Sequence, residues 1–129
     1  MKKLLAILEN ELNIKKGNKG MYAISKDVFI NKVWNGLYNE YLEGSITGTI
    51  QNPLASIQYD ADTICFTRMD YNALNINIMR RKNNNITVNL ADVKSINISI
   101  SENDWIDIHL LSSADDNDYS SYVSIVIRG

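Results

Sequence analysis

Aliphatic residues alternate with polar ones through most of the chain from Leu74 to its C-terminus. A period of two is typical of a β-strand that buries one of its faces. The segments are separated by short polar runs, including KNNN at 82–85 and SEND at 101–104, which leave no room for the crossover that parallel pairing requires. We therefore expect an antiparallel meander. Its buried positions are predicted to be Leu74, Ile76 and Ile78; Ile86, Val88 and Leu90; Ile96, Ile98 and Ile100; Ile106, Ile108 and Leu110; and Val123, Ile125 and Ile127.

Weaker strand patterns occupy the middle of the chain. Residues 45–51 read SITGTIQ, a strand weakened by Gly48 and ended by Asn52 and Pro53, because glycine costs backbone entropy and proline lacks a ladder donor. Two more short strands are expected at SIQYD (56–60) and DTICFTRM (62–69). Together with the C-terminal segments, these patterns predict a sheet of about five to seven strands.

The first residues of the chain have a helical period. Met1, Leu4 and Leu8 share one helix face with Leu5 and Leu12, so an amphipathic helix is expected from about residue 2 to residue 13. A secretory signal peptide needs an uninterrupted apolar stretch of about 7–15 residues, whereas two glutamates interrupt this one. We interpret the segment as part of the fold, and we expect no membrane partner.

A second helix is predicted from Lys26 to about Glu43. Ser25 is placed to cap its N-terminus, Asp27 favours its first turn, and Gly44 follows where a C-terminal glycine is common. The apolar face of this helix is wide, about 220° against the ~100° stripe of a helix that lies on a single surface. The helix should therefore touch several neighbours. This face comprises Phe29, Ile30, Val33, Trp34, Leu37, Tyr38, Tyr41 and Leu42.

These patterns predict an α+β fold in which two N-terminal helices pack on one face of a mostly antiparallel sheet. The length of 129 residues suits a single domain over residues 1–129, and no linker or repeat divides it. A composition of 45% hydrophobic and 22% charged residues is typical of a soluble globular protein. Cys65 has no partner for an internal disulfide, which favours a reducing, cytoplasmic location.

The predicted sheet face opposite the isoleucines is nearly neutral. Solvated sheet faces usually carry lysine and glutamate, which discourage association, but this face is rich in asparagine and serine and includes aromatic groups. We interpret it as a contact surface for a protein partner or for further copies of the chain, in a homodimer or higher oligomer. The alternative is a coding bias toward asparagine. The residues predicted to make the contact are Asn97, Ser99, Trp105, His109, Tyr122 and Ser124.

Groups able to do chemistry are scarce. The sequence contains one cysteine and one histidine, so no metal site is expected. Cys65 stands between Ile64 and Phe66 in a predicted strand, where a thiol behaves as a small hydrophobe, and His109 belongs to the neutral face. The loop ADDNDYSS (114–121) lacks both the glycine and the final glutamate of a calcium loop. We predict no catalytic residue and no cofactor.

A short basic run, Arg80, Arg81 and Lys82, precedes the asparagine-rich turn. Arginines on neighbouring strands, with Arg68 and Arg128 added, would be able to hold a phosphate or carboxylate through paired hydrogen bonds. The alternative is a solvated charge cluster that protects a strand edge. Nucleic acid is disfavoured as a partner, because the net charge is −2 and the sequence has no basic stripe.

The shortage of reactive groups favours binding over catalysis. Our leading hypothesis is a non-enzymatic cytoplasmic protein that acts by surface contact with a protein partner, as inhibitor, immunity or anti-defence proteins do. A small anionic ligand or nucleotide, bound by the arginines, is the first alternative. An accessory subunit of a larger assembly is the second. An enzyme would need a concave polar pocket, which a sequence does not reveal.

Overall fold

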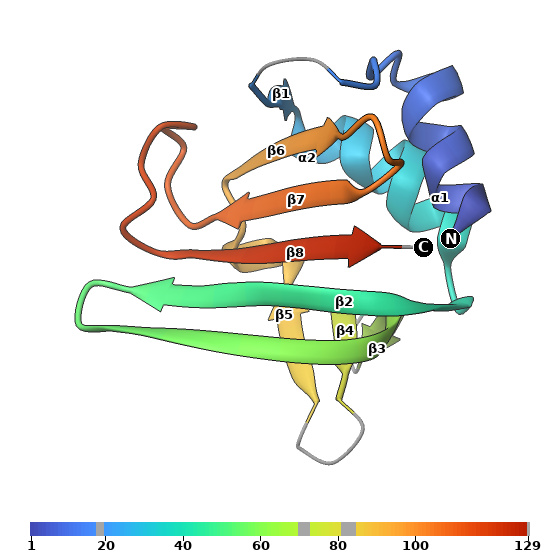
Figure 1. The fold of residues 1–129 in the computed structure, drawn as a ribbon. Coiled ribbons are helices and arrows are strands. Elements are labelled where there is room, and N and C mark those ends of the chain that lie inside the picture. The colour runs from blue at the N-terminus through green and yellow to red at the C-terminus, as the bar shows by residue number, and fades with distance from the viewer. Residues whose placement is uncertain (18–19, 70–72, 81–84, 129) are drawn as a thin grey trace.

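The computed structural model describes residues 1–17, 20–69, 73–80 and 85–128. These residues form one eight-stranded antiparallel sheet in the order β1-β6-β7-β8-β2-β3-β4-β5 (Figure 1). The α+β class and the antiparallel sheet are confirmed, whereas the predicted five to seven strands were too few. The strands are β1 (Tyr22–Ile24), β2 (Tyr41–Asn52), β3 (Ala55–Met69), β4 (Ala73–Met79), β5 (Ile86–Asn89), β6 (Ser95–Ile100), β7 (Ile106–Leu111) and β8 (Tyr122–Arg128).

The alternating segments predicted from Leu74 onward are confirmed as β4 to β8. Strand β7, which runs from Ile106 to Leu111, lies between β6 and β8. The register sets Ile98, Ile108 and Ile125 side by side across these three strands, and each of the three is at most 1% exposed. Burial of such a side chain contributes about 1.5–3 kcal/mol, so this row forms the centre of the core.

The helical segments lie together at one end of the sheet (Figure 1). Ser25 caps the second segment as predicted, because its hydroxyl accepts a hydrogen bond from the Val28 amide at 3.1 Å. Strand β1 lies between the two segments in the chain, so the helices do not both precede the sheet. No helix in the described ranges is long and apolar enough to span a membrane. The segments are α1 (Lys2–Ala6) with a wider π-type turn at Ile7–Glu11, and α2 (Lys26–Val28) with a π-type turn at Phe29–Trp34 and a tight last turn at Asn35–Leu37.

The second helix ends earlier than the sequence predicted. It stops at Leu37, and Asn39 then takes a left-handed conformation with a φ of 62°, which ends a helix as a C-terminal glycine would. The Asn39 amide donates to the carbonyl of Phe66 at 2.9 Å, which aligns the following residues with β3. The helix predicted to reach Glu43 was therefore wrong at its end, and Gly44 belongs to β2.

The middle of the chain is one long hairpin. The strands predicted at 56–60 and 62–69 are a single strand of 15 residues, β3, which pairs with the 12 residues of β2. Asn52 closes the turn, because its side-chain oxygen accepts hydrogen bonds from the amides of Leu54 and Ala55 at 2.9 and 3.0 Å. An asparagine that bonds to the backbone ahead of it is a common turn device.

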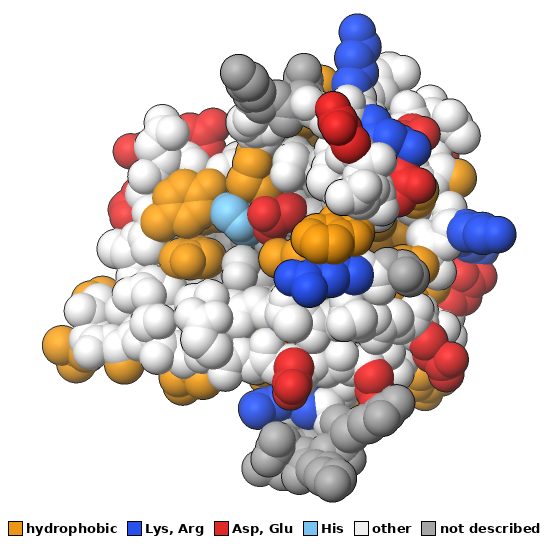
Figure 2. Space-filling view, viewed as in Figure 1, with side chains coloured by type: hydrophobic (Ala, Val, Ile, Leu, Met, Phe, Trp, Pro, Cys, Tyr) orange, Lys and Arg blue, Asp and Glu red, His pale blue; other side chains and the backbone are white. Residues whose placement is uncertain are grey.

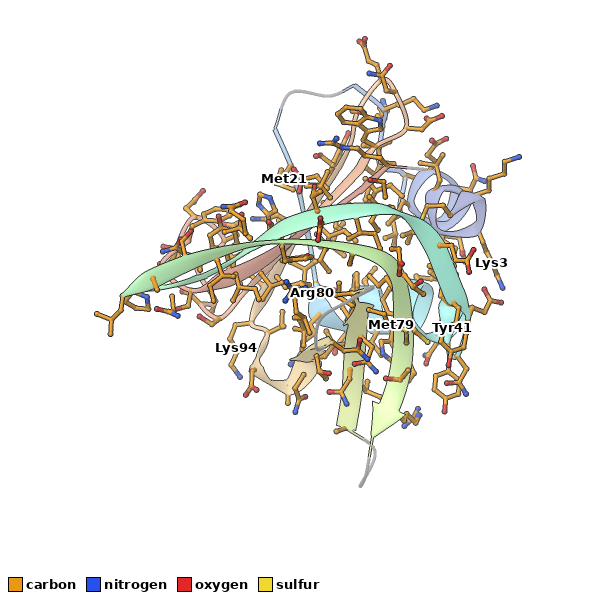
Figure 3. The ribbon with its side chains drawn as sticks, turned by 60° about the horizontal axis from the view of Figure 1, so that its bottom comes forward. Lys3, Met21, Tyr41, Met79, Arg80 and Lys94 are labelled. Carbon is orange, nitrogen blue, oxygen red and sulfur yellow. The ribbon has the colours of Figure 1, made fainter. Side chains whose placement is uncertain are left out.

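A bulge bends this hairpin. The pairing of β2 with β3 shifts between Glu43 and Ile46, and an extra residue in one strand bends the strand and increases its twist. In β3, Tyr59 is buried on one side of the shift, and three consecutive residues, Ile64, Cys65 and Phe66, are buried on the other side. Figure 3 shows the β2–β3 ribbon turning sharply toward one end. One half of the hairpin therefore pairs with β8, and the other half packs against the second helix.

Gly48 lies in the half of the hairpin that pairs with β8, and it lets the two strands lie close together. The Tyr59 hydroxyl crosses over Gly48 and donates to the Ser124 carbonyl at 2.6 Å, while the Thr49 amide donates to the Ser124 hydroxyl at 2.8 Å. A β-carbon at Gly48 would clash with both the Ser124 carbonyl and the Tyr59 ring. Burial also raises the pKa of the Tyr59 phenol, which stays protonated and able to donate.

We predict that Gly48→Ala lowers the free energy of unfolding by about 3 kcal/mol, toward the upper end of the range for overpacked sites. Urea denaturation measures the change. Gly36→Ala is the matched control, because the nearest atom to its new β-carbon would be the flexible end of Ile7 at 3.1 Å. Equal stability of the two variants would contradict the close packing at Gly48.

Candidate functional site

The curved sheet encloses an apolar groove of about 380 Å³. Strand β5 is an edge of the sheet, yet it lies across this groove from β2, β7 and β8, to which it is not hydrogen-bonded. The groove exists because the sheet curls until its two parts face each other. Its aliphatic lining comprises Ile50, Ile86, Val88, Val93, Leu110, Leu111 and Val123, and its polar residues include Gln51, Asn89, Ser112, Ser121 and Tyr122.

One wall of the groove is a short helical turn, Leu90–Asp92, between β5 and β6. The Asn89 side chain caps the turn by accepting a hydrogen bond from the Ala91 amide at 2.9 Å. Lys26 of the second helix donates to the carbonyl of Leu90 at 3.0 Å, and Leu90 itself is buried. These contacts fix the turn relative to the second helix.

The residues predicted to contact a partner do not form an open surface. Asn97 is 5% exposed and Ser124 is 8% exposed, so the exposure expected at these two positions was wrong. The reason is the loop 112–121, which folds back over β6 and β7: the Asn97 side chain donates to the carbonyl of Asp116 and to the hydroxyl of Tyr119, both at 3.0 Å. Ser99 is half-buried opposite Asp107.

His109 lies at the centre of a polar cluster under this loop. Its Nε2 is 3.0 Å from a carboxylate oxygen of Asp107, and its Nδ1 is 3.2 Å from the hydroxyl of Tyr119. The rings of Tyr119 and Tyr122 meet edge to face with their centroids 5.1 Å apart. Figure 2 shows the histidine between a carboxylate and apolar side chains. Both ring nitrogens face protein groups. We therefore interpret the cluster as a set of contacts that holds the loop 112–121 against the sheet, and we call it the latch.

Tyr119 was missed by the sequence analysis. It stands in a charged loop with no periodic pattern, and nothing in the sequence says that this loop returns to His109. Cys65, in contrast, is buried in β3 as expected. Burial raises the pKa of its thiol, which disfavours the nucleophilic thiolate. Within the described residues, no group of three or more histidine, cysteine or acidic side chains is placed to hold a metal ion.

The arginines predicted to bind an anion are not brought together. The Arg68 guanidinium lies 5.2 Å from the ring centre of Trp34, and that of Arg128 lies 4.4 Å from the ring centre of Trp105, which is itself 41% exposed. Arg80 follows the end of β4 and is half-buried. Arg81 and Lys82 lie outside the described residues. Arg68 and Arg128 thus stack on separate tryptophans and do not share a site.

Comparisons with known proteins add little. No family model matches the chain, and no curated protein matches it. Among solved structures, the chain is similar to the crystal structure of ChuX, with a TM-score of 0.49 and 11% sequence identity over 95% of this chain and 74% of that one. A similarity of this degree supports no conclusion about ligand or activity.

We predict that Tyr119→Phe lowers the free energy of unfolding by about 1–2 kcal/mol, because Asn97 and His109 each lose a hydrogen-bond partner. It should also speed proteolytic cleavage within 112–121. Denaturation and limited proteolysis measure these effects. Tyr41→Phe is the control, since Tyr41 is 68% exposed. A loop that is cleaved at the same rate in all three proteins would argue against the latch.

Proposed function

We propose that this chain is a non-enzymatic binding protein that holds a small, mainly apolar ligand in the groove between β5 and the strands β2, β7 and β8. The observation that carries the proposal is the aliphatic lining of a groove of about 380 Å³. Pockets for small molecules have volumes of about 300–1,000 Å³ and are lined mostly by apolar side chains. Each buried methylene of such a ligand would contribute about 0.8 kcal/mol.

The arrangement of the wall supports this proposal. The turn Leu90–Asp92 is fixed by its own cap and by Lys26, so little free energy is lost in ordering the site on binding. Polar residues that line the groove, including Ser112 and Ser121, would orient a ligand. His109 points to the face of β7 opposite to that of Leu110, because successive residues of a strand alternate, and this supports binding over chemistry.

We predict that Ile50→Trp weakens the binding of decanol at least about tenfold, because the larger ring fills the groove and about 1.4 kcal/mol is then lost. Isothermal titration calorimetry measures the affinity. Ile57→Trp is a closely matched control: Ile57 is the register partner of Ile50 on β3 but does not line the groove and is 53% exposed. Failure of the unaltered protein to bind decanol would refute the proposed ligand class.

Contact with a protein partner is a second candidate, supported by a different observation. Leu54 is 96% exposed and Ile57 is 53% exposed at the tip of the β2–β3 hairpin, which extends beyond the rest of the sheet (Figure 1). Exposed aliphatic groups on a projecting tip suit contact with another protein surface. This moves the predicted contact away from the face that the loop 112–121 covers.

If this tip mediates association between copies of the chain, Leu54→Ser combined with Ile57→Ser should abolish it. Light scattering across a concentration series measures the mass, and an oligomer is expected for the unaltered protein. Val28→Ser is the control, because Val28 is 40% exposed on the second helix, away from the hairpin tip. An unaltered protein that remains a monomer at every concentration would exclude self-association.

A further inference from the structure

Arg80 follows strand β4 and does not itself line the groove, but its row of β4 residues pairs with strand β5, which does. In the register, Ile78 of β4 pairs with Ile86 of β5, which lines the groove. Alternate residues of a strand share a face, so Arg80 at the end of β4 extends the same row as Ile76 and Ile78. Figure 3 shows Arg80 inside the curve of the sheet, beneath the β2–β3 ribbon.

The guanidinium of Arg80 has an unsatisfied donor. Its Nε is shielded from solvent, and within the described part of the chain no hydrogen-bond partner reaches it. A buried donor without an acceptor costs free energy, and the cost is larger when the group is charged. Arg68 and Arg128 avoid this cost because they are exposed and lie over aromatic rings. Arg80 is therefore the described arginine with the strongest requirement for an acceptor.

We propose that the ligand of this groove is an amphiphilic anion, with an apolar body against the aliphatic lining and a carboxylate or phosphate that meets the Arg80 guanidinium. The planar guanidinium forms paired hydrogen bonds with either acid. The inference rests on the proposed function and adds the charge of the ligand to it. Asp92, an acidic residue that lines the groove, is exposed, so water and salt screen its repulsion of the acid.

The test compares ligands that share one chain and differ in their head group. The protein is titrated by calorimetry with decanoate, decyl phosphate and decanol, each below the concentration at which it forms micelles. The two acids are expected to bind about 10- to 100-fold more tightly than decanol, the range for a hydrogen bond to a charged group. A preference between decanoate and decyl phosphate would identify the head group.

Variants of Arg80 then locate the acid. Arg80→Met should reduce the affinity for both acids to about that for decanol, while Arg80→Lys should retain part of the advantage. Arg68→Met is the matched control, because it removes the same charge from a residue that stacks on Trp34. This control should bind all three ligands as the unaltered protein does.

The outcomes separate the two proposals. Equal affinity for acids and alcohol in the unaltered protein would overturn the role of Arg80 and leave the apolar groove standing, and this comparison needs no variant to fold. If Arg80→Met and Arg68→Met lose equal affinity for the two acids, the effect is due to the net charge of the protein, and the role of Arg80 is overturned. Failure of all three ligands to bind would overturn both proposals.

Discussion

The bend of the β2–β3 hairpin determines the shape of the whole sheet. The pairing of β2 with β3 shifts between Glu43 and Ile46. On one side of this bulge β2 pairs with β8, and on the other side β3 pairs with β4. In a flat sheet, β5 would lie far from β7, because four other strands separate them in the order. The groove and the packing of Phe29 near Phe66 both depend on this bend.

The two faces of β7 and β8 make different contacts. Leu110 and Val123 face the groove, while His109 belongs to the polar cluster beneath the loop 112–121. This loop satisfies Asn97, a buried amide that would otherwise be costly. His109 and Asn97 are therefore engaged in holding a loop, and the opposite face carries part of the aliphatic lining of the groove.

The arginines show why a list of charges does not define a site. Arg68, Arg80 and Arg128 were grouped because they belong to a sheet, and a sheet brings distant residues together. The structure places two of them over different tryptophans and the third after the end of β4. Strand order and the curl of the sheet decide such distances, and neither follows from the spacing of the residues along the chain.

Local pattern was sufficient for the alternating strands, the N-terminal helix and the cap at Ser25, because each depends on neighbours within a few residues. The antiparallel pairing followed from the short connections. Sequence alone did not determine the end of the second helix, the union of two strands into β3, or the covering of Asn97 and Ser124. In each case contacts with residues far along the chain prevailed: Phe66 receives the Asn39 amide, β2 pairs along the full length of β3, and Tyr119 reaches the Asn97 side chain. The groove belongs to the same class, since it forms only when the bend at Glu43 and Ile46 brings β5 opposite β8.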